Sequence, residues 1–133
     1  MKPVQSWHTY TTRLESPEEV ALMPRVSGVI DQITFKEGDD VKQGDLLFQL
    51  DDRPFAAVVA SLEAQILSAK AALNQAKSEA KRAIRLTERN AISTEQAQAR
   101  TSTLHQREAQ LAALQAQLTS AQLDLEFTAI RSP

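Results

Sequence analysis

Apolar residues in the second half of the chain recur at alternating steps of three and four. The pattern runs from Phe55 through Val58 to Ala83, and it resumes at Ala97 and continues to Leu125. This spacing puts the apolar side chains on one stripe of a helix and is typical of a coiled-coil seam. We therefore predict two long helices, and the larger residues of their seams are Leu62, Ile66, Leu73, Leu104, Leu111, Leu114 and Leu118.

Residues 81–94, KRAIRLTERNAIST, interrupt this pattern. Folding the chain back around Asn90 brings Leu62 opposite Leu118 and Ile66 opposite Leu114, as in an antiparallel hairpin. Ser93 followed by Gln96 has the spacing of a capping box, which predicts that the second helix begins there. Each helix would have about 33 residues and a length of roughly 50 Å.

Two arginines of the second helix fall at seam positions. Arg100 lies opposite Ala80, and Arg107 lies opposite Leu73. Their aliphatic stems can cover the seam while their charges reach water. We therefore expect the seam to weaken toward the turn of the hairpin.

The segment before the hairpin has a different pattern. Residues 20–50 contain short apolar pieces separated by polar turns, and we expect three or four strands of a small β-sandwich there. Gly28, Gly38 and Gly44 are predicted to be structural turn residues of this half, and Gly38 and Gly44 fall in polar turns where a positive φ is favoured. Asp51 or Asp52 could cap the first helix, and Pro54 suits its first turn.

These patterns predict an α+β fold, in which a long antiparallel coiled-coil hairpin is inserted in half of a β-sandwich. Four segments follow from them: an N-terminal segment 1–19 with a candidate strand at 7–14, a first β half at 20–53, the hairpin at 54–126 with its tip near 87–93, and a returning strand at 127–133. The last segment, FTAIRSP, starts a second β half, and we expect the sheet to have an unpaired edge.

Composition excludes several classes of function. The chain has no cysteine, which removes disulfides, thiol catalysis and cysteine-ligated zinc. A net charge of −2 gives no reason to expect a nucleic-acid partner. No uninterrupted apolar run approaches the roughly 20 residues that a membrane span needs. We find no metal-ligand spacing, phosphate loop or nucleophile motif, and we expect neither a cofactor nor catalysis.

The order of these segments resembles a known family. The stretch PRVSGVIDQITFKEGDDVKQGDLLFQLD is similar to half of a lipoyl or biotinyl motif, a long hairpin follows, and LDLEFTAIRSP closes the chain. This combination resembles the periplasmic adaptors (membrane fusion proteins) of tripartite efflux pumps, above all those of resistance-nodulation-division (RND) transporters. The resemblance implies a lipoyl-like β-module and identifies the chain as an N-terminal fragment, without the lipidated cysteine, membrane anchor or signal peptide of many members.

The resemblance also implies a function for the tip. Family members that dock to TolC-type outer-membrane channels carry an Arg–Leu–Ser motif at this place, and Arg82, Leu86 and Ser93 have its spacing. It thus implies an inner-membrane transporter and an outer-membrane channel as partners, a homo-oligomer in the assembled pump, and a periplasmic location. Taken alone, Ser93 could be only a helix cap and Arg82 only a solvated residue.

Other functions were weighed against this one. In a lipoyl carrier the turn after LLFQLD would present a lysine, but Arg53 stands there and cannot form the amide bond. An adaptor of type I protein secretion or heavy-metal efflux fits the same segments. A coiled-coil scaffold unrelated to transport would explain the hairpin but not the glycine-containing strands before it.

Overall fold

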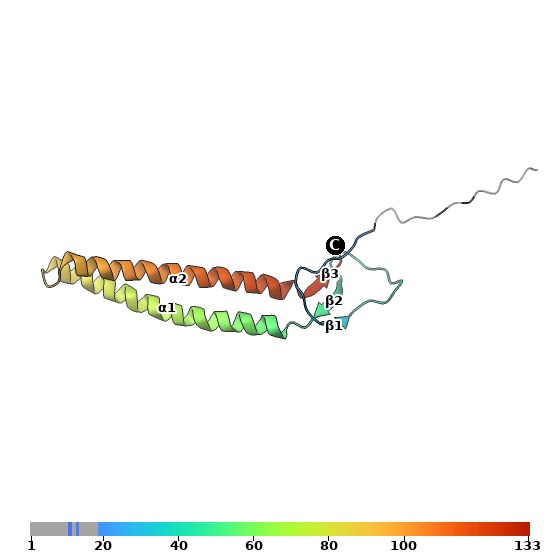
Figure 1. Cartoon of the computed structure of the whole chain (residues 1–133), viewed down its shortest axis with the longest axis horizontal. Coiled ribbons are helices and arrows are strands. Elements are labelled where there is room, and N and C mark those ends of the chain that lie inside the picture. Colours follow the sequence, from blue (N-terminus) through green and yellow to red (C-terminus); the bar gives the residue numbers. More distant parts are fainter. Residues whose placement is uncertain (1–10, 12, 14–18) are drawn as a thin grey trace, which may run out of the picture.

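The computed structural model describes residues 11, 13 and 19–133 and shows a long hairpin joined to a small sheet (Figure 1). The candidate strand at 7–14 falls, apart from residues 11 and 13, outside the described residues. The elements follow in the order β1 (Ile30–Ile33), β2 (Leu46–Leu50), α1 (Arg53–Glu88), α2 (Thr94–Glu126) and β3 (Ala129–Arg131). The expected α+β fold is confirmed.

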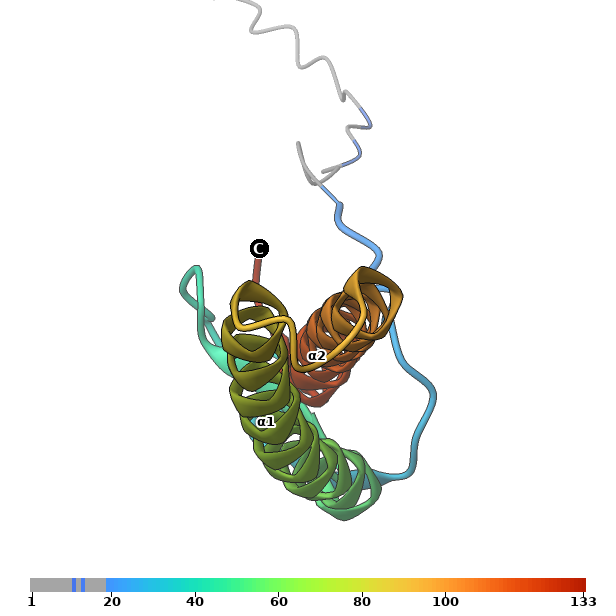
Figure 2. The same ribbon diagram turned by 90° about the vertical axis from the view of Figure 1, so that its left-hand side faces the viewer.

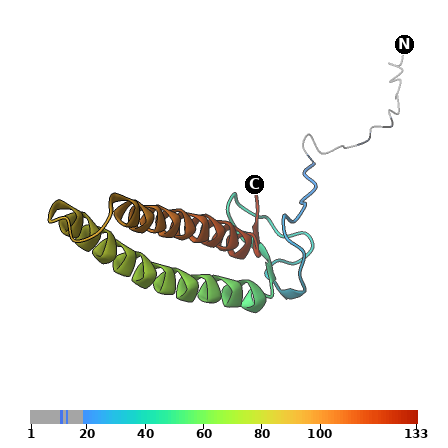
Figure 3. The ribbon, with the colours of Figure 1, turned by 60° about the vertical axis from the view of Figure 1, so that its left-hand side comes forward.

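Helices α1 and α2 lie side by side and antiparallel along their whole length (Figures 1 and 3). They have 36 and 33 residues, which corresponds to a hairpin of about 50 Å. Seen from the tip, the connecting turn lies in front and the sheet lies at the opposite end of both helices (Figure 2). The hairpin therefore presents its turn far from the sheet that holds its base.

The interface between the helices is built from small and medium side chains. Fully buried positions are alanines together with Ile66 and Leu73, which are each 7% exposed. The other large seam residues are half-buried, because a two-helix hairpin leaves the flanks of its seam open to water: Leu62, Leu104, Leu111, Leu114 and Leu118. Burial is thus spread along the hairpin and does not form a globular core.

The prediction for Val58 was wrong. Val58 is 52% exposed, and its neighbour Val59 is half-buried in the interface. Steps that alternate strictly between four and three residues lead back from Ile66 through Leu62 to Val59. Reaching Val58 instead requires two successive steps of four residues. A helix that keeps a constant face toward its partner follows the strict alternation.

Arg100 and Arg107 are both exposed, so their charges reach water. The half-buried Thr101 lies next to Arg100 on the inner side of α2, and its hydroxyl donates to the Ala97 carbonyl at 3.1 Å. This part of the seam consequently depends on small side chains.

Helix α1 is long and apolar enough, by length and composition, to cross a membrane. The expectation from uninterrupted apolar runs missed this because alanines raise the hydropathy of α1 between its polar residues. Length and composition do not distinguish a membrane span from a helix that packs in a coiled coil, and α1 packs along α2.

The sheet is antiparallel, with β2 between β1 and β3. Two strands, and not three or four, form between residues 20 and 50. Leu47 and Leu50 of β2 are buried, and the ring of Phe48 meets that of Phe35 edge to face at 5.2 Å. The edge strand β1 is much more open, since Ile30 and Ile33 are 52% and 58% exposed.

The loop between β1 and β2 contains the same turn twice. In KEGD the amide of Lys36 donates to the Asp39 carboxylate at 2.8 Å, and in KQGD the amide of Lys42 donates to Asp45 at the same distance. Each aspartate amide donates back to the lysine carbonyl at 3.1 Å. The third residue of each turn is a glycine with positive φ, +90° at Gly38 and +88° at Gly44, a conformation that costs glycine little.

Gly28 differs from these two glycines. A Cβ at this position would lie 3.6 Å from Leu50 at the end of β2, which is an ordinary van der Waals distance, so the packing there does not require a glycine. Its φ is not in the left-handed region.

Hydrogen bonds join the sheet to both ends of the hairpin. At the start of α1, Asp51 accepts the Arg53 amide at 3.2 Å and pairs with its guanidinium at 2.8 Å, while Asp52 makes no side-chain cap. The hydrogen bond from the Arg53 side chain lowers the pKa of Asp51. At the end of α2, the buried Thr128 donates to the Leu125 carbonyl at 2.7 Å and accepts from Gln49 of β2 at 3.2 Å.

Candidate docking surface at the hairpin tip

The turn between the helices ends α1 in a Schellman motif. Asn90 has φ of +55°, and its amide donates to the Thr87 carbonyl at 2.9 Å. The Ala91 amide donates to the Leu86 carbonyl at 2.8 Å. Asparagine tolerates the left-handed conformation better than other residues with a side chain, so the sequence itself places the stop of α1 at this point.

The start of α2 is capped by Ser93. Its hydroxyl accepts the backbone amide of Gln96 at 3.2 Å, and its backbone is extended, as in a typical N-cap. The predicted cap is thereby confirmed. Ser93 remains exposed, so the cap does not remove its side chain from the surface.

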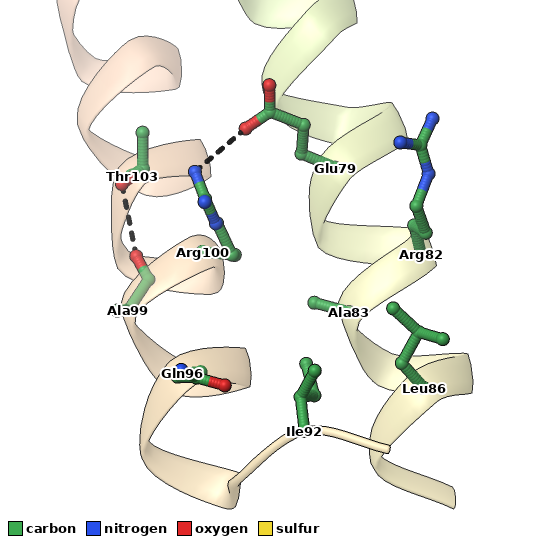
Figure 4. A pocket seen from close by; sticks show the side chains of 9 residues that line it. All are labelled: Glu79, Arg82, Ala83, Leu86, Ile92, Gln96, Ala99, Arg100 and Thr103. Atoms are coloured by element: carbon green, nitrogen blue, oxygen red, sulfur yellow. Dashed lines mark hydrogen bonds and ion pairs between the residues drawn. The ribbon is translucent and has the colours of Figure 1, made fainter. Parts of the chain in front are cut away.

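A groove of about 550 Å³ runs between the two helices just behind this turn (Figure 4). Its walls are two stripes with the spacing i, i+3, i+4 and i+7, one on each helix, and Ile92 of the turn closes its end. Nine residues line it: Glu79, Arg82, Ala83, Leu86, Ile92, Gln96, Ala99, Arg100 and Thr103. The alanines leave it hollow, because they fill little of the space between the helices.

Charges of opposite sign meet across the groove. The Arg100 guanidinium of α2 lies 3.2 Å from the Glu79 carboxylate of α1, and Figure 4 shows the two side chains pointing toward each other. Glu79 also accepts a hydrogen bond from Gln75 at 3.0 Å. Arg82 lies along α1 without a hydrogen bond or ion pair to any residue of the described part of the chain (Figure 4).

The structure brings two of the three predicted docking residues together. Arg82 is exposed, Leu86 is half-buried, and both line the groove. Ser93 lies at the start of α2, outside the lining. The side chains therefore form one mixed surface of a cation and an apolar wall, with a hydroxyl beyond its end.

Sequence reasoning did not identify the ion pair across the groove or the residue that closes its end. Arg100 was assigned to the seam, and Glu79 and Ile92 were not singled out. Glu79 and Arg100 lie almost equally far from Asn90, so a hairpin centred on Asn90 would have indicated that they face each other. The ion pair itself depends on how the helices are rotated, which spacing does not specify.

Within the described part of the chain, no three His, Asp or Glu side chains are grouped in a way that could hold a metal ion. The arrangement at the tip offers contact chemistry: an apolar wall, a guanidinium and exposed hydroxyl and amide groups. These groups suit the recognition of another protein.

Comparison with known proteins agrees with the fold. Residues 18–133 match the family described as RND MFP (membrane fusion protein), barrel-sandwich hybrid domain. The probable efflux pump periplasmic linker protein SepA of Pseudomonas putida is 43% identical over 47 residues, which are 35% of this chain and 12% of SepA. The efflux pump periplasmic linker BepF of Brucella suis is 35% identical over 69 residues, 52% of this chain and 17% of BepF.

A solved structure shows the same arrangement. MacA from Actinobacillus actinomycetemcomitans superposes with a TM-score of 0.58 at 28% identity, covering 82% of this chain and 38% of MacA. The chain thus spans less than half of the length of each of these proteins. The family match covers most of the sequence, including the sheet and the whole hairpin, and the chain belongs to the RND membrane fusion protein family, of which it contains the barrel-sandwich hybrid domain.

Proposed function

We propose that this chain is part of a periplasmic adaptor that links an inner-membrane RND efflux transporter to an outer-membrane channel for the export of drugs or other small molecules. The observation that carries the proposal is the family match over residues 18–133. The names of the similar proteins support it, since SepA and BepF are efflux pump periplasmic linkers. The adaptor itself is not an enzyme, and transport is driven by the pump.

In this function the hairpin tip docks to a channel of the TolC type. Arg82, Leu86 and Ser93 would make the contact. Support comes from their position at the far end of a hairpin of about 50 Å, where Arg82 and Leu86 share one groove wall and Ser93 is exposed next to it. Leucine supplies buried apolar area, and arginine supplies a charge that can form paired hydrogen bonds with carboxylates.

The sheet end has a separate role in this proposal. Residues 20–53 form the first half of a lipoyl-like module, the hairpin is inserted after it, and residues 127–133 begin the second half. The antiparallel pairing of β3 with β2 supports this, since the chain returns to the same sheet after the hairpin. Several copies would stand side by side in the assembled pump, in the periplasm and attached to the inner membrane.

Substitutions at the tip test the docking. In a strain whose resistance depends on this pump, Leu86→Asp or Arg82→Asp in the native gene should remove drug resistance, because either change places a carboxylate in the groove wall. Ile84→Asp is the matched control, since Ile84 lies between these two residues in sequence, is 51% exposed and does not line the groove. The helical content of each purified variant is compared by circular dichroism.

The expected result is loss of resistance in both tip variants, with unchanged helicity and normal resistance in the control. Full resistance in both tip variants would refute the docking. Ser93→Asp keeps an acceptor for the helix cap, so a loss of resistance in that variant would assign Ser93 a contact beyond capping.

A further inference from the structure

The groove at the tip has a charge arrangement that the three docking residues do not explain. Arg100 reaches from α2 toward α1 and holds Glu79 at 3.2 Å, although 59% of its side chain is exposed to water. Exposed pairs of this kind contribute little to stability because water and salt screen them. The ion pair therefore contributes little to the stability of the hairpin, and another carboxylate can replace Glu79 as the partner of Arg100 at a small cost in free energy.

The tip also carries an excess of positive charge. Residues 79–103 contain five Lys and Arg against three Glu, in a chain whose net charge is −2. Two of these cations, Arg82 and Arg100, belong to opposite walls of the same groove, and Glu79 is the one acidic residue that lines it. The groove thus has an excess of positive charge next to an apolar wall formed by Ala83, Leu86 and Ile92.

We propose that the groove binds an acidic side chain at a helix end of the docking partner, and that Glu79 holds the place of this carboxylate until the partner arrives. The proposal rests on the proposed function, in which the hairpin tip docks to an outer-membrane channel. On binding, the partner's carboxylate pairs with Arg82 and Arg100, and an apolar side chain beside it packs on Leu86 and Ile92. Arg100 is then a specificity-determining residue of the docking surface, and Glu79 is an internal competitor.

Charge complementarity selects this partner chemistry. An acidic residue in the groove has a guanidinium on each wall, Arg100 and the exposed Arg82, whereas a basic residue would meet two like charges beside a carboxylate already paired with Arg100. Thr103 does not compete, because its hydroxyl donates to the Ala99 carbonyl of its own helix at 3.0 Å.

The test measures binding of the purified chain to a purified TolC-type channel in lipid nanodiscs at low and high salt. The variants are Glu79→Gln, Arg100→Gln and the double substitution. Gln at position 79 can still accept the hydrogen bond from Gln75 while it loses the charge. Arg107→Gln is the matched control, because Arg107 lies two turns further along α2, outside the groove, and donates to Gln110 on its own helix.

Opposite effects of the two single substitutions are expected. Glu79→Gln should tighten binding by about threefold, because it removes the competitor, and Arg100→Gln should weaken it by about fivefold. The double variant should bind as weakly as Arg100→Gln, and Arg107→Gln should bind as the unsubstituted chain does. High salt should weaken the unsubstituted chain more than Arg100→Gln.

Other outcomes overturn the proposal in distinguishable ways. If each of Glu79→Gln and Arg100→Gln weakens binding and also lowers helicity, the ion pair serves only to hold the two helices together. If neither substitution changes binding while Leu86→Asp abolishes it, the tip docks to the channel but the groove does not bind a carboxylate of the partner. If the folded, unsubstituted chain does not bind at either salt concentration, the docking and the inference both fail.

Discussion

Two leucines of α1 provide a direct test of the packing that holds the hairpin together. Leu73 is 7% exposed in the interface with α2, whereas Leu67 is 71% exposed on the other side of the same helix. Replacing either one by alanine removes the same atoms and raises intrinsic helix propensity slightly. The difference between the two variants therefore reports burial alone.

The magnitude follows from the surroundings of each side chain. Truncating a buried leucine costs about 2–5 kcal/mol, and the lower half of this range applies to Leu73 because a two-helix interface can partly close around the lost volume. An exposed leucine contributes within about 0.5 kcal/mol. We expect Leu73→Ala to lower the free energy of unfolding by about 2–3 kcal/mol and Leu67→Ala to leave it nearly unchanged.

Thermal unfolding followed by far-ultraviolet circular dichroism measures this difference. A loss of about 2–3 kcal/mol corresponds to a fall in Tm on the order of 10–15 °C for a domain of this size. Equal falls in the two variants would refute this interface, and a larger fall for Leu67→Ala would mean that α1 is rotated by about a third of a turn.

Three further predictions concern the turn and the base of the hairpin. Asn90→Ala should destabilise the hairpin by about 1 kcal/mol, and Asn90→Gly should not, because only alanine is strained at φ of +55°; urea unfolding measures both. Thr128→Val should cost about 1–3 kcal/mol in the same assay, since it removes a buried hydroxyl that donates to the Leu125 carbonyl and accepts one of the two hydrogen bonds of the Gln49 amide. Arg53 lowers the pKa of Asp51, so the stabilisation from this pair is present at pH values above the unfolded pKa near 3.8 and is lost as the pH falls through the lowered pKa of the folded state. In an NMR titration, Arg53→Gln should raise the titration midpoint of Asp51 toward 3.8. An unchanged midpoint would exclude the pair with Arg53 as the cause of the lowered pKa.

The tip combines local and long-range determinants in a way that bears on the proposed docking. The Schellman turn at Asn90 and the cap at Ser93 are set by neighbouring residues, and their hydrogen bonds satisfy the end of α1 and the start of α2. The groove behind the turn exists because alanines occupy the seam there, and its charges come from both helices. The proposed docking surface therefore depends both on the local turn and on how the two helices pack.

The sequence by itself determined the helices, the turn and the cap, because each depends on residues close together in the chain. Alternating apolar steps indicate a helix with one buried stripe, Asn90 accepts a positive φ, and Ser93 lies three residues before the amide that it caps. The strict alternation would even have identified Val59, had it been applied back from Ile66.

Only the tertiary structure decided which side chains meet across the hairpin. Whether Arg100 lies in the seam or pairs with Glu79, and whether Ser93 joins the groove of Arg82 and Leu86, depends on the rotation and stagger of α2 against α1. The number of strands before the hairpin also depended on pairing across the sheet. These features arise from distances through space between segments far apart in the chain, and a periodic pattern along one helix contains no measure of them.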